Sequence, residues 1–297
     1  MKKTRFLSLL FALLLLLQLT AAPVFAETAA SAADAPAQPQ DAAADEQPDS
    51  VSEDRLLSSR TSFTVAAKAA LLIDLNTDRV VYEQDADARI YPASLTKIMT
   101  CLIALENGNL SDVVTVSQSA MNDLDADSSV AGLKVGEQLT LENLLYCMML
   151  QSGNDACNVI AEHIAGSVTD FVRMMNQRAY ELGCQDTHFN NPHGLHDESH
   201  YTTARDLAII TEAALKSENF RQIVDSYEYV MPATNMTEEH KIKTTNMLIY
   251  QSLGNSLYYP RAHGIKTGYT SQAGRCVISE ATGDGLDLLG IVCGAAT

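Results

Sequence analysis

Residues 91–97 read Tyr-Pro-Ala-Ser-Leu-Thr-Lys, and they open a strong helical pattern. Apolar residues recur on one face of the segment 94–106, which predicts a helix that begins at Ser94. Ser94 and Lys97 are three residues apart and therefore share a face of that helix. A lysine one turn away can take the hydroxyl proton if burial or a second cation lowers its pKa. Alone, S-x-x-K is a weak motif, because it also describes a helix-start serine followed by a solvated lysine.

Two further motifs lie downstream, each in a setting that suits an active site. Residues 152–154 (Ser-Gly-Asn) separate two apolar helical patterns, and alone they describe an inter-helix turn with Asn154 as the next N-cap. Residues 266–268 (Lys-Thr-Gly) end a strand-like run, where the glycine allows a ligand backbone to approach closely. In this order, S-x-x-K, S-x-N and K-T-G form the active-site set of penicillin-binding proteins and class A β-lactamases.

The order of the expected elements predicts an α+β fold. Strand-like runs at 66–74 and 79–83 flank a turn and predict a β-hairpin. A long helical middle follows, and strand-like runs return near the end. This order indicates an α/β sandwich in which the first and last strands share one sheet. Besides 94–106, helices are expected at 140–150, 155–165, 169–182 and 203–215, and the last strands at 262–267, 275–281 and 286–294.

With these motifs in place, the chain resembles the serine-type D-alanyl-D-alanine carboxypeptidases, the low-molecular-mass penicillin-binding proteins. The likeness covers residues 64–297. It implies a β-lactamase/penicillin-binding-protein-like transpeptidase fold, with an antiparallel sheet flanked by helices, an all-helical lobe, and the active site in the cleft between them. The similar segments are Y-P-A-S-L-T-K-I-M-T (91–100), Q-S-G-N-D-A (151–156), N-P-H-G-L-H-D (191–197), Y-T-T-A-R-D-L-A (201–208) and G-I-K-T-G-Y-T (264–270).

The resemblance assigns catalytic roles to the first two motifs. Ser94 would be the acylated nucleophile and Lys97 its general base. Ser152 and Asn154 would line the opposite wall of the cleft. Ser152 would relay protons, and Asn154 would hold amide groups of the substrate.

The same resemblance assigns substrate binding to residues 266–269. Lys266 would supply positive charge that lowers the pKa of the base and polarises the S-x-N serine. Thr267 would hydrogen-bond the terminal carboxylate of the substrate, and Gly268 would permit close approach. The backbone N–H groups of Ser94 and Tyr269 would form the oxyanion hole.

The implied reaction removes the C-terminal D-Ala from peptidoglycan stem peptides that end in D-Ala-D-Ala. It passes through an acyl-enzyme, and β-lactam antibiotics would inhibit by acylating the same Ser94. The resemblance implies no metal and no organic cofactor. Nucleic acid is not expected as a partner, because 20 basic and 37 acidic residues give a net charge of −17.

Three other readings stay open. A serine β-lactamase shares the motifs, but no E-x-x-L-N string occurs between the second and third of them. A zinc peptidase is disfavoured because the four histidines between 188 and 200 include no H-E-x-x-H. A non-catalytic β-lactam-binding sensor could keep every motif. The six cysteines are expected to be buried free thiols, with Cys276–Cys293 the one pair to test for a disulfide.

The N-terminal residues predict export. Residues 1–26 have a basic start, an apolar run and a small-residue cleavage site, which together describe a signal peptide. Residues 27–60 predict a disordered, acidic spacer rich in Ala and Pro. Residues 61–297 are expected to form the catalytic domain, apparently without the C-terminal helix of the family. The protein is expected outside the cytoplasmic membrane, secreted or periplasmic. Membrane attachment is expected only through an uncleaved signal or a C-terminal anchor, which this chain lacks.

Overall fold

The computed structural model describes residues 64–122, 124 and 128–296. The predicted signal peptide and acidic spacer lie outside the described residues. Within those residues, the structure contains no helix that is both long and apolar enough to cross a membrane.

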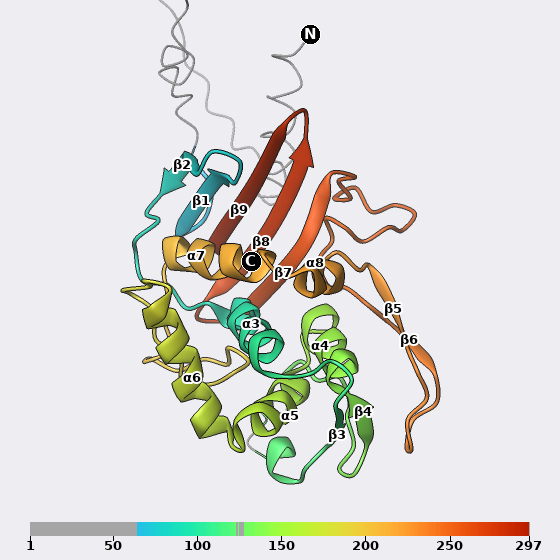
Figure 1. Ribbon diagram of the computed structural model, residues 1–297. Coiled ribbons are helices and arrows are strands. Elements are labelled where there is room, and N and C mark those ends of the chain that lie inside the picture. Colours follow the sequence, from blue (N-terminus) through green and yellow to red (C-terminus); the bar gives the residue numbers. More distant parts are fainter. Residues whose placement is uncertain (1–63, 123, 125–127, 297) are drawn as a thin grey trace, which may run out of the picture.

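A five-stranded antiparallel sheet joins the two ends of the described chain (Figure 1). The strand order is β2-β1-β9-β8-β7, so β1 near the start of the fold pairs with β9 at its end. The expectation that the first and last strands share one sheet is confirmed. The strands are β1 (Ala69–Asp74), β2 (Arg79–Gln84), β7 (Ala262–Thr270), β8 (Gly274–Gly283) and β9 (Leu286–Ala295).

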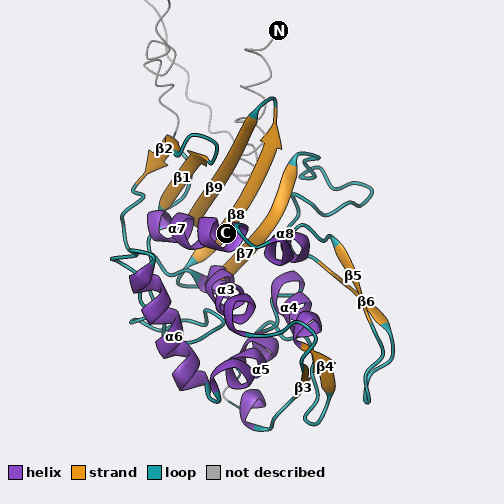
Figure 2. Cartoon of the chain, viewed as in Figure 1, coloured by secondary structure: helices purple, strands orange, loops and turns teal. Residues whose placement is uncertain are grey.

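Helices cover one face of the sheet and continue into a separate lobe (Figure 2). Helices α7 and α8 lie against the strands, whereas α4, α5 and α6 form the lobe around the central α3. The side chains of Thr140, Ser167, Thr203 and Ser217 cap α4, α6, α7 and α8 by accepting backbone N–H groups of the first turn. The helices are α3 (Lys97–Asn107), α4 (Leu141–Leu150), α5 (Asn154–Ala165), α6 (Val168–Glu181), α7 (Ala204–Leu215) and α8 (Glu218–Val224).

One hydrophobic core links the sheet to the lobe. Leu71 of β1 and Ile291 of β9 point to the same buried cluster as Ile98, Leu144 and Ile160 of the helices. Every second residue of β1 enters this cluster, whereas Ala70 and Leu72 pack into smaller clusters on the other face of the sheet. The predicted α+β class is confirmed.

Several elements differ from the expectation. Residues Ala93–Thr96 form a 3-10 turn, η1, in which Ala93 has a φ of +47°. The α-helix therefore begins only at Lys97. Ser94 therefore lies in η1. Helix α8 was not expected. The other unexpected elements are the short strands β3 (Val113–Thr115), β4 (Gln138–Thr140), β5 (Glu228–Met231) and β6 (His240–Lys243) and the 3-10 turn η2 (Ser119–Met121).

Candidate active site

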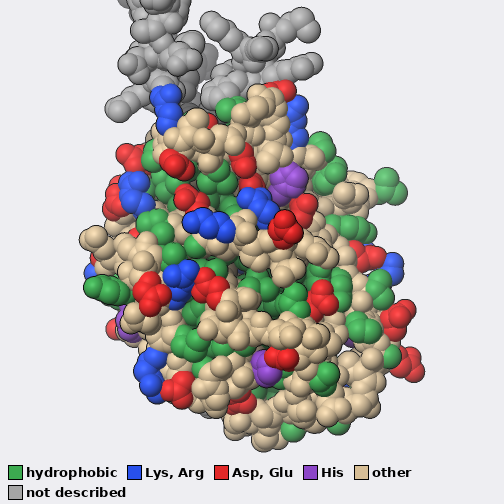
Figure 3. Space-filling view, viewed as in Figure 1, with side chains coloured by type: hydrophobic (Ala, Val, Ile, Leu, Met, Phe, Trp, Pro, Cys, Tyr) green, Lys and Arg blue, Asp and Glu red, His purple; other side chains and the backbone are tan. Residues whose placement is uncertain are grey.

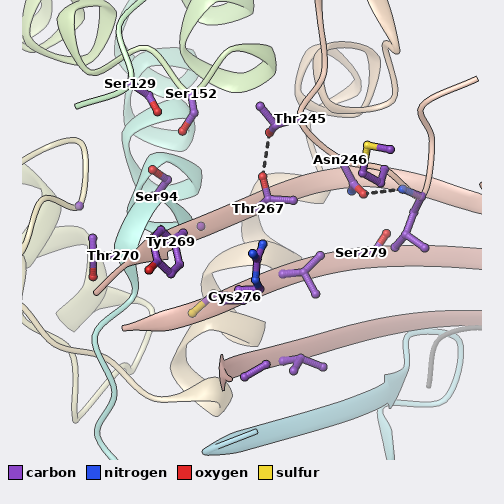
Figure 4. A pocket seen from close by; sticks show the side chains of 18 of the residues that line it. Ser94, Ser129, Ser152, Thr245, Asn246, Thr267, Tyr269, Thr270, Cys276 and Ser279 are labelled. Carbon is purple, nitrogen blue, oxygen red and sulfur yellow. Dashed lines mark hydrogen bonds between the residues drawn. The ribbon is translucent and has the colours of Figure 1, made fainter. Parts of the chain in front are cut away.

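The three motifs meet at a cavity between the edge strand β7 and the helical lobe (Figure 4). The cavity measures about 810 Å³ and is lined by Ser94, Ser152 and Asn154 on one side and by Thr267 and Tyr269 on the other. Positions separated by more than 170 residues in the sequence thus share one pocket. The predicted convergence of S-x-x-K, S-x-N and K-T-G is present in the structure.

The amine of Lys97 has three partners. Its Nζ lies 3.0 Å from Ser94 Oγ, 2.7 Å from Asn154 Oδ1 and 2.8 Å from the carbonyl oxygen of His193. Asn154 Oδ1 and the carbonyl can only accept hydrogen bonds, whereas the hydroxyl can also donate. A neutral amine has two hydrogens for the two acceptors and one lone pair for the hydroxyl. The geometry therefore suits proton transfer from Ser94 to Lys97.

Burial lowers the pKa of both lysines of the site. The side chains of Lys97 and Lys266 are 0% and 1% exposed. Burial lowers the pKa of Lys97, although the nearby Cys157 and Asp155 oppose the shift. Burial also lowers the pKa of Lys266 far below its usual value, and the charge of Lys97 adds to that effect. The sequence predicts that Lys266 lowers the pKa of Lys97, but in the structure the shift of Lys97 comes from burial, and the repulsion acts on the pKa of Lys266. In this structure Lys266 Nζ donates to the carbonyl oxygen of Thr267 at 3.0 Å.

The S-x-N turn is shaped by backbone constraints. Ser152 has a φ of +62°, and Gly153 is the N-cap of α5. A Cβ on Gly153 would come within 2.9 Å of Asp155 Oδ1 and 3.0 Å of Ala131 Cβ, so this position requires glycine. Asn154 is not the N-cap that the simple-turn reading supposed. Its side chain accepts from Lys97, and its N–H donates to the carbonyl of residue 129.

Gly268 brings β7 close to the turn that carries Ser94. A Cβ at this position would lie 3.1 Å from the Ser94 backbone nitrogen and 3.2 Å from the Pro92 oxygen. The sequence predicts close approach of a ligand to this glycine, and the structure shows that the backbone of η1 also approaches it. Tyr269, the next residue, has an exposed ring at the mouth of the cavity.

A loop after β6 contributes residues that sequence reasoning missed. Thr245 Oγ1 lies 2.7 Å from Thr267 Oγ1, as Figure 4 shows. The backbone N–H of Thr245 donates to the Leu150 carbonyl, next to the S-x-N turn. Asn246 Nδ2 donates to the Gly264 carbonyl at 2.7 Å. The loop is therefore tied both to α4 and to β7, and it holds a second hydroxyl beside Thr267.

Asp155 anchors another wall of the site. Its carboxylate is 0% exposed and accepts backbone N–H groups from Ala131, Gly132 and Leu133, at 2.8, 2.9 and 3.1 Å, and from Ala156 at 2.9 Å. One buried carboxylate thus satisfies donors of a loop that would otherwise lose their hydrogen bonds.

Replacing Asp155 with alanine is therefore expected to lower the free energy of unfolding by roughly 2–4 kcal/mol, because the loop N–H groups lose a charged acceptor. Urea unfolding followed by circular dichroism measures the change. Asp197→Ala is the matched control, because that residue is only partly buried and its carboxylate accepts hydrogen bonds from Ser199 in its own turn. Equal stability of the Asp155 variant and the control would contradict this role.

His200, one of the histidines of the 188–200 cluster, has a structural role. His200 Nδ1 accepts a hydrogen bond from the Asn190 N–H at 3.1 Å, so the neutral ring carries its proton on Nε2. This Nε2–H donates to Thr96 Oγ1 at 2.9 Å. Thr96 in turn donates to the Ala93 carbonyl, which ties His200 to η1. Among the residues that the structure describes, no group of three His, Cys, Asp or Glu side chains is arranged to hold a metal ion.

The neutral form of His200 predicts a pH dependence of stability. Burial lowers its pKa from 6.5 to about 4, so the folded state binds fewer protons than the unfolded state between these values. Stability from this group is therefore present above pH 6.5 and falls by roughly 3 kcal/mol as the pH drops to 4. Denaturant unfolding of the wild type and His200→Asn at pH 7 and pH 4 tests this. Their difference should shrink towards acid, and a constant difference would refute the assignment.

The cysteines are buried throughout. All six are free thiols in the structure. Burial raises the pKa of Cys157, which lies near Lys97 and Lys266, to about 11. Cys276 and Cys293 lie on the paired strands β8 and β9, and the Cys293 thiol lowers the pKa of Cys276.

Comparisons with known proteins point to one family. A family model described as D-alanyl-D-alanine carboxypeptidase matches residues 56–297. Among curated proteins, D-alanyl-D-alanine carboxypeptidase DacF of Bacillus subtilis is 37% identical over 236 residues, and DacA of Escherichia coli K12 is 34% identical over 242. Each match covers 78% of this chain but only 58% and 57% of the relative. The chain thus spans less than two thirds of the length of these relatives.

Solved structures confirm the fold class that the resemblance implied. The DD-transpeptidase of Streptomyces K15 superposes with a TM-score of 0.73 at 32% identity and covers 80% of this chain and 93% of its own. A D-alanyl-D-alanine carboxypeptidase from Mycobacterium tuberculosis gives a TM-score of 0.70 at 29% identity, over 78% of this chain and 84% of its own. The antiparallel sheet with flanking helices and a helical lobe is shared with DD-peptidases.

Proposed function

This chain belongs to the D-alanyl-D-alanine carboxypeptidase family of serine peptidases, and we propose on that basis that it removes the terminal D-Ala from peptidoglycan stem peptides ending in D-Ala-D-Ala. One observation carries the proposal. Lys97 Nζ lies 3.0 Å from Ser94 Oγ, and its two other partners are pure acceptors. A serine and a buried amine in this relation form a nucleophile and its base.

The reaction proceeds in two steps at Ser94. Neutral Lys97 takes the hydroxyl proton while Ser94 Oγ bonds to the carbonyl carbon of the penultimate D-Ala. The C–N bond to the last D-Ala breaks, and the departing amine receives a proton from Lys97, with Ser152 as relay. Water then adds to the acyl carbon, the Ser94 ester bond breaks, and the hydroxyl is restored. β-Lactams acylate the same oxygen and stay bound because their deacylation is slow.

Residues of the K-T-G strand hold the substrate. Thr267 donates to the terminal carboxylate, supported by the hydroxyl of Thr245 at 2.7 Å. The backbone N–H groups of Ser94 and Tyr269 bind the oxyanion, which the close approach of β7 to η1 at Gly268 supports. Asn154 holds a substrate amide. Lys266 adds positive potential deep in the cavity.

The organisation of the whole chain is part of the proposal. We infer that residues 61–297 form the catalytic domain, that residues 27–60 are a spacer, and that residues 1–26 direct export. The reaction then takes place between the cytoplasmic membrane and the cell wall, where stem peptides are exposed. The basic and apolar pattern of the first residues supports this placement.

Release of D-alanine tests the proposal. The protein is mixed with an N-acetylated tripeptide ending in D-Ala-D-Ala or with a matched peptide ending in D-Ala-L-Ala, and the free alanine released from each is measured by an assay that detects both enantiomers. We expect release from the first peptide and little from the second. Absence of release together with stable penicillin labelling would favour a β-lactam sensor. Rapid multiple turnover of nitrocefin would favour a β-lactamase.

A further inference from the structure

An arginine on the cavity wall has no part in the steps above. Arg275 lies on β8 directly across from Tyr269 of β7. The centre of its guanidinium lies 5.8 Å from the centre of the Tyr269 ring. Arg275 lines the same cavity as Ser94 and Thr267. The side chain is exposed, so it can meet a ligand that enters from solvent.

Arg275 differs from most arginines of this acidic protein in lacking a carboxylate partner. On the face in Figure 3, basic side chains lie beside acidic ones. Within the described residues, Arg275 forms no ion pair, and of the other arginines only Arg79 shares this property. The arginines that pair with a carboxylate are Arg89, Arg173, Arg178, Arg205, Arg221 and Arg261.

Strand geometry places Arg275 near the proposed carboxylate site. Thr267 pairs with Val277, and Tyr269 pairs with Arg275, without a register shift between them. Cross-strand partners share a face of the sheet, so Thr267 and Arg275 are diagonal neighbours on one face. Diagonal neighbours lie roughly 7–8 Å apart, within the reach of a long side chain. A carboxylate held by the Thr267 hydroxyl is therefore accessible to the guanidinium.

A carboxylate that enters the cavity needs an accessible cation with a matching set of donors. Lys97 and Lys266 are buried and are not among the residues that line the cavity, whereas the exposed Arg275 lines it. A guanidinium stays charged at every physiological pH, and its planar set of N–H donors matches the two oxygens of a carboxylate. Arg275 meets both requirements at the open side of the pocket.

We propose that Arg275 is a substrate-binding residue that recognises the free C-terminal carboxylate of the peptide, together with the Thr267 hydroxyl. The inference rests on the proposed carboxypeptidase function and deepens it. It explains how the pocket selects a chain terminus over an internal peptide bond. An amidated terminus keeps the scissile bond but lacks the charge, so it forfeits this contact.

The test compares two peptides on matched variants. The N-acetylated tripeptide with a free D-Ala-D-Ala terminus and its C-terminal amide are given to the wild type, Arg275→Gln and Arg275→Lys. Loss of a charge-assisted contact should lower kcat/KM for the free acid about 10- to 100-fold in Arg275→Gln. The amide should change less than about 2-fold, because it never made the contact. Arg275→Lys should fall between, since it keeps the charge and loses the planar fork.

Lys68→Gln is the matched control. Lys68 is exposed, lies near Cys276, and donates to the Gln272 carbonyl, but it does not line the cavity. Equal effects of Lys68→Gln and Arg275→Gln would mean that positive charge attracts the peptide at long range, without a direct contact, and would overturn the proposal. Equal loss for acid and amide, or no loss for either, would also overturn it.

A second readout separates this inference from the proposed function. Binding of the same two peptides to Ser94→Ala protein, with and without Arg275→Gln, is measured by calorimetry and needs no turnover. A wild type that turns over neither peptide would refute the carboxypeptidase function. The inference would still stand or fall on whether Arg275→Gln weakens binding of the acid and not of the amide.

Discussion

Ser94→Ala is expected to abolish both covalent labelling by a fluorescent penicillin and release of D-Ala. The variant removes the only atom to which the acyl group is attached in the proposed reaction. Loss of a nucleophile that works in concert with its base lowers turnover by at least about 10⁴-fold. Gel fluorescence measures the labelling, and an enzyme-coupled assay measures D-Ala.

The control for Ser94→Ala is Ser117→Ala, which removes a partly buried hydroxyl that hydrogen-bonds Glu162 in the lobe and does not line the cavity. It should label like the wild type. Ser94 also contacts Lys97, so the melting temperature of the variant is measured to show that the fold persists. A Ser94→Ala protein that still labels with penicillin would contradict the assignment of the nucleophile.

Lys97→Met has the second largest expected effect. Methionine is close to lysine in length and removes the amine, so acylation by penicillin should slow by roughly 10³-fold, the range for loss of a general base. The variant leaves Asn154 Oδ1 and the His193 carbonyl without their donor, which costs stability as well. Stopped-flow acylation rates separate the chemical effect from any loss of folded protein.

The pH profile of acylation distinguishes the base from a structural lysine. Because burial lowers the pKa of Lys97, its amine is neutral over more of the neutral range than an exposed lysine. The wild-type rate should fall as the pH drops through that lowered pKa, since a protonated amine cannot accept the serine proton. In Lys97→Met this fall in the acylation rate at low pH should disappear. If the fall persists in the variant, another group causes it.

The sequence was informative about the fold because its signals were local. The hairpin at β1 and β2, the helix that follows Ser94 and the last three strands each have a periodicity that a short window reveals. Helix α8 and the β5–β6 pair were missed because they span four to seven residues, too few to establish a period. Their positions depend on packing against α4 and β7.

The residues of the site could likewise be predicted only in part. The motif residues could be found because their spacing has a chemical meaning. Thr245, Asp155 and His200 could not, since each is a common polar residue in an ordinary loop or first helical turn. Their roles arise from contacts made only in the folded chain: Thr245 with Thr267, Asp155 with the loop at 131–133, and His200 with η1.

The most direct test of the account identifies the acylated residue and measures whether its acylation stops the activity. The protein is titrated with benzylpenicillin, digested and mapped by mass spectrometry, and D-Ala release is measured at each degree of labelling. We predict one penicilloyl group per chain, on the fragment that contains Ser94, with D-Ala release falling in proportion to the labelled fraction. An adduct on another residue, or undiminished D-Ala release by fully labelled protein, would contradict the central claim.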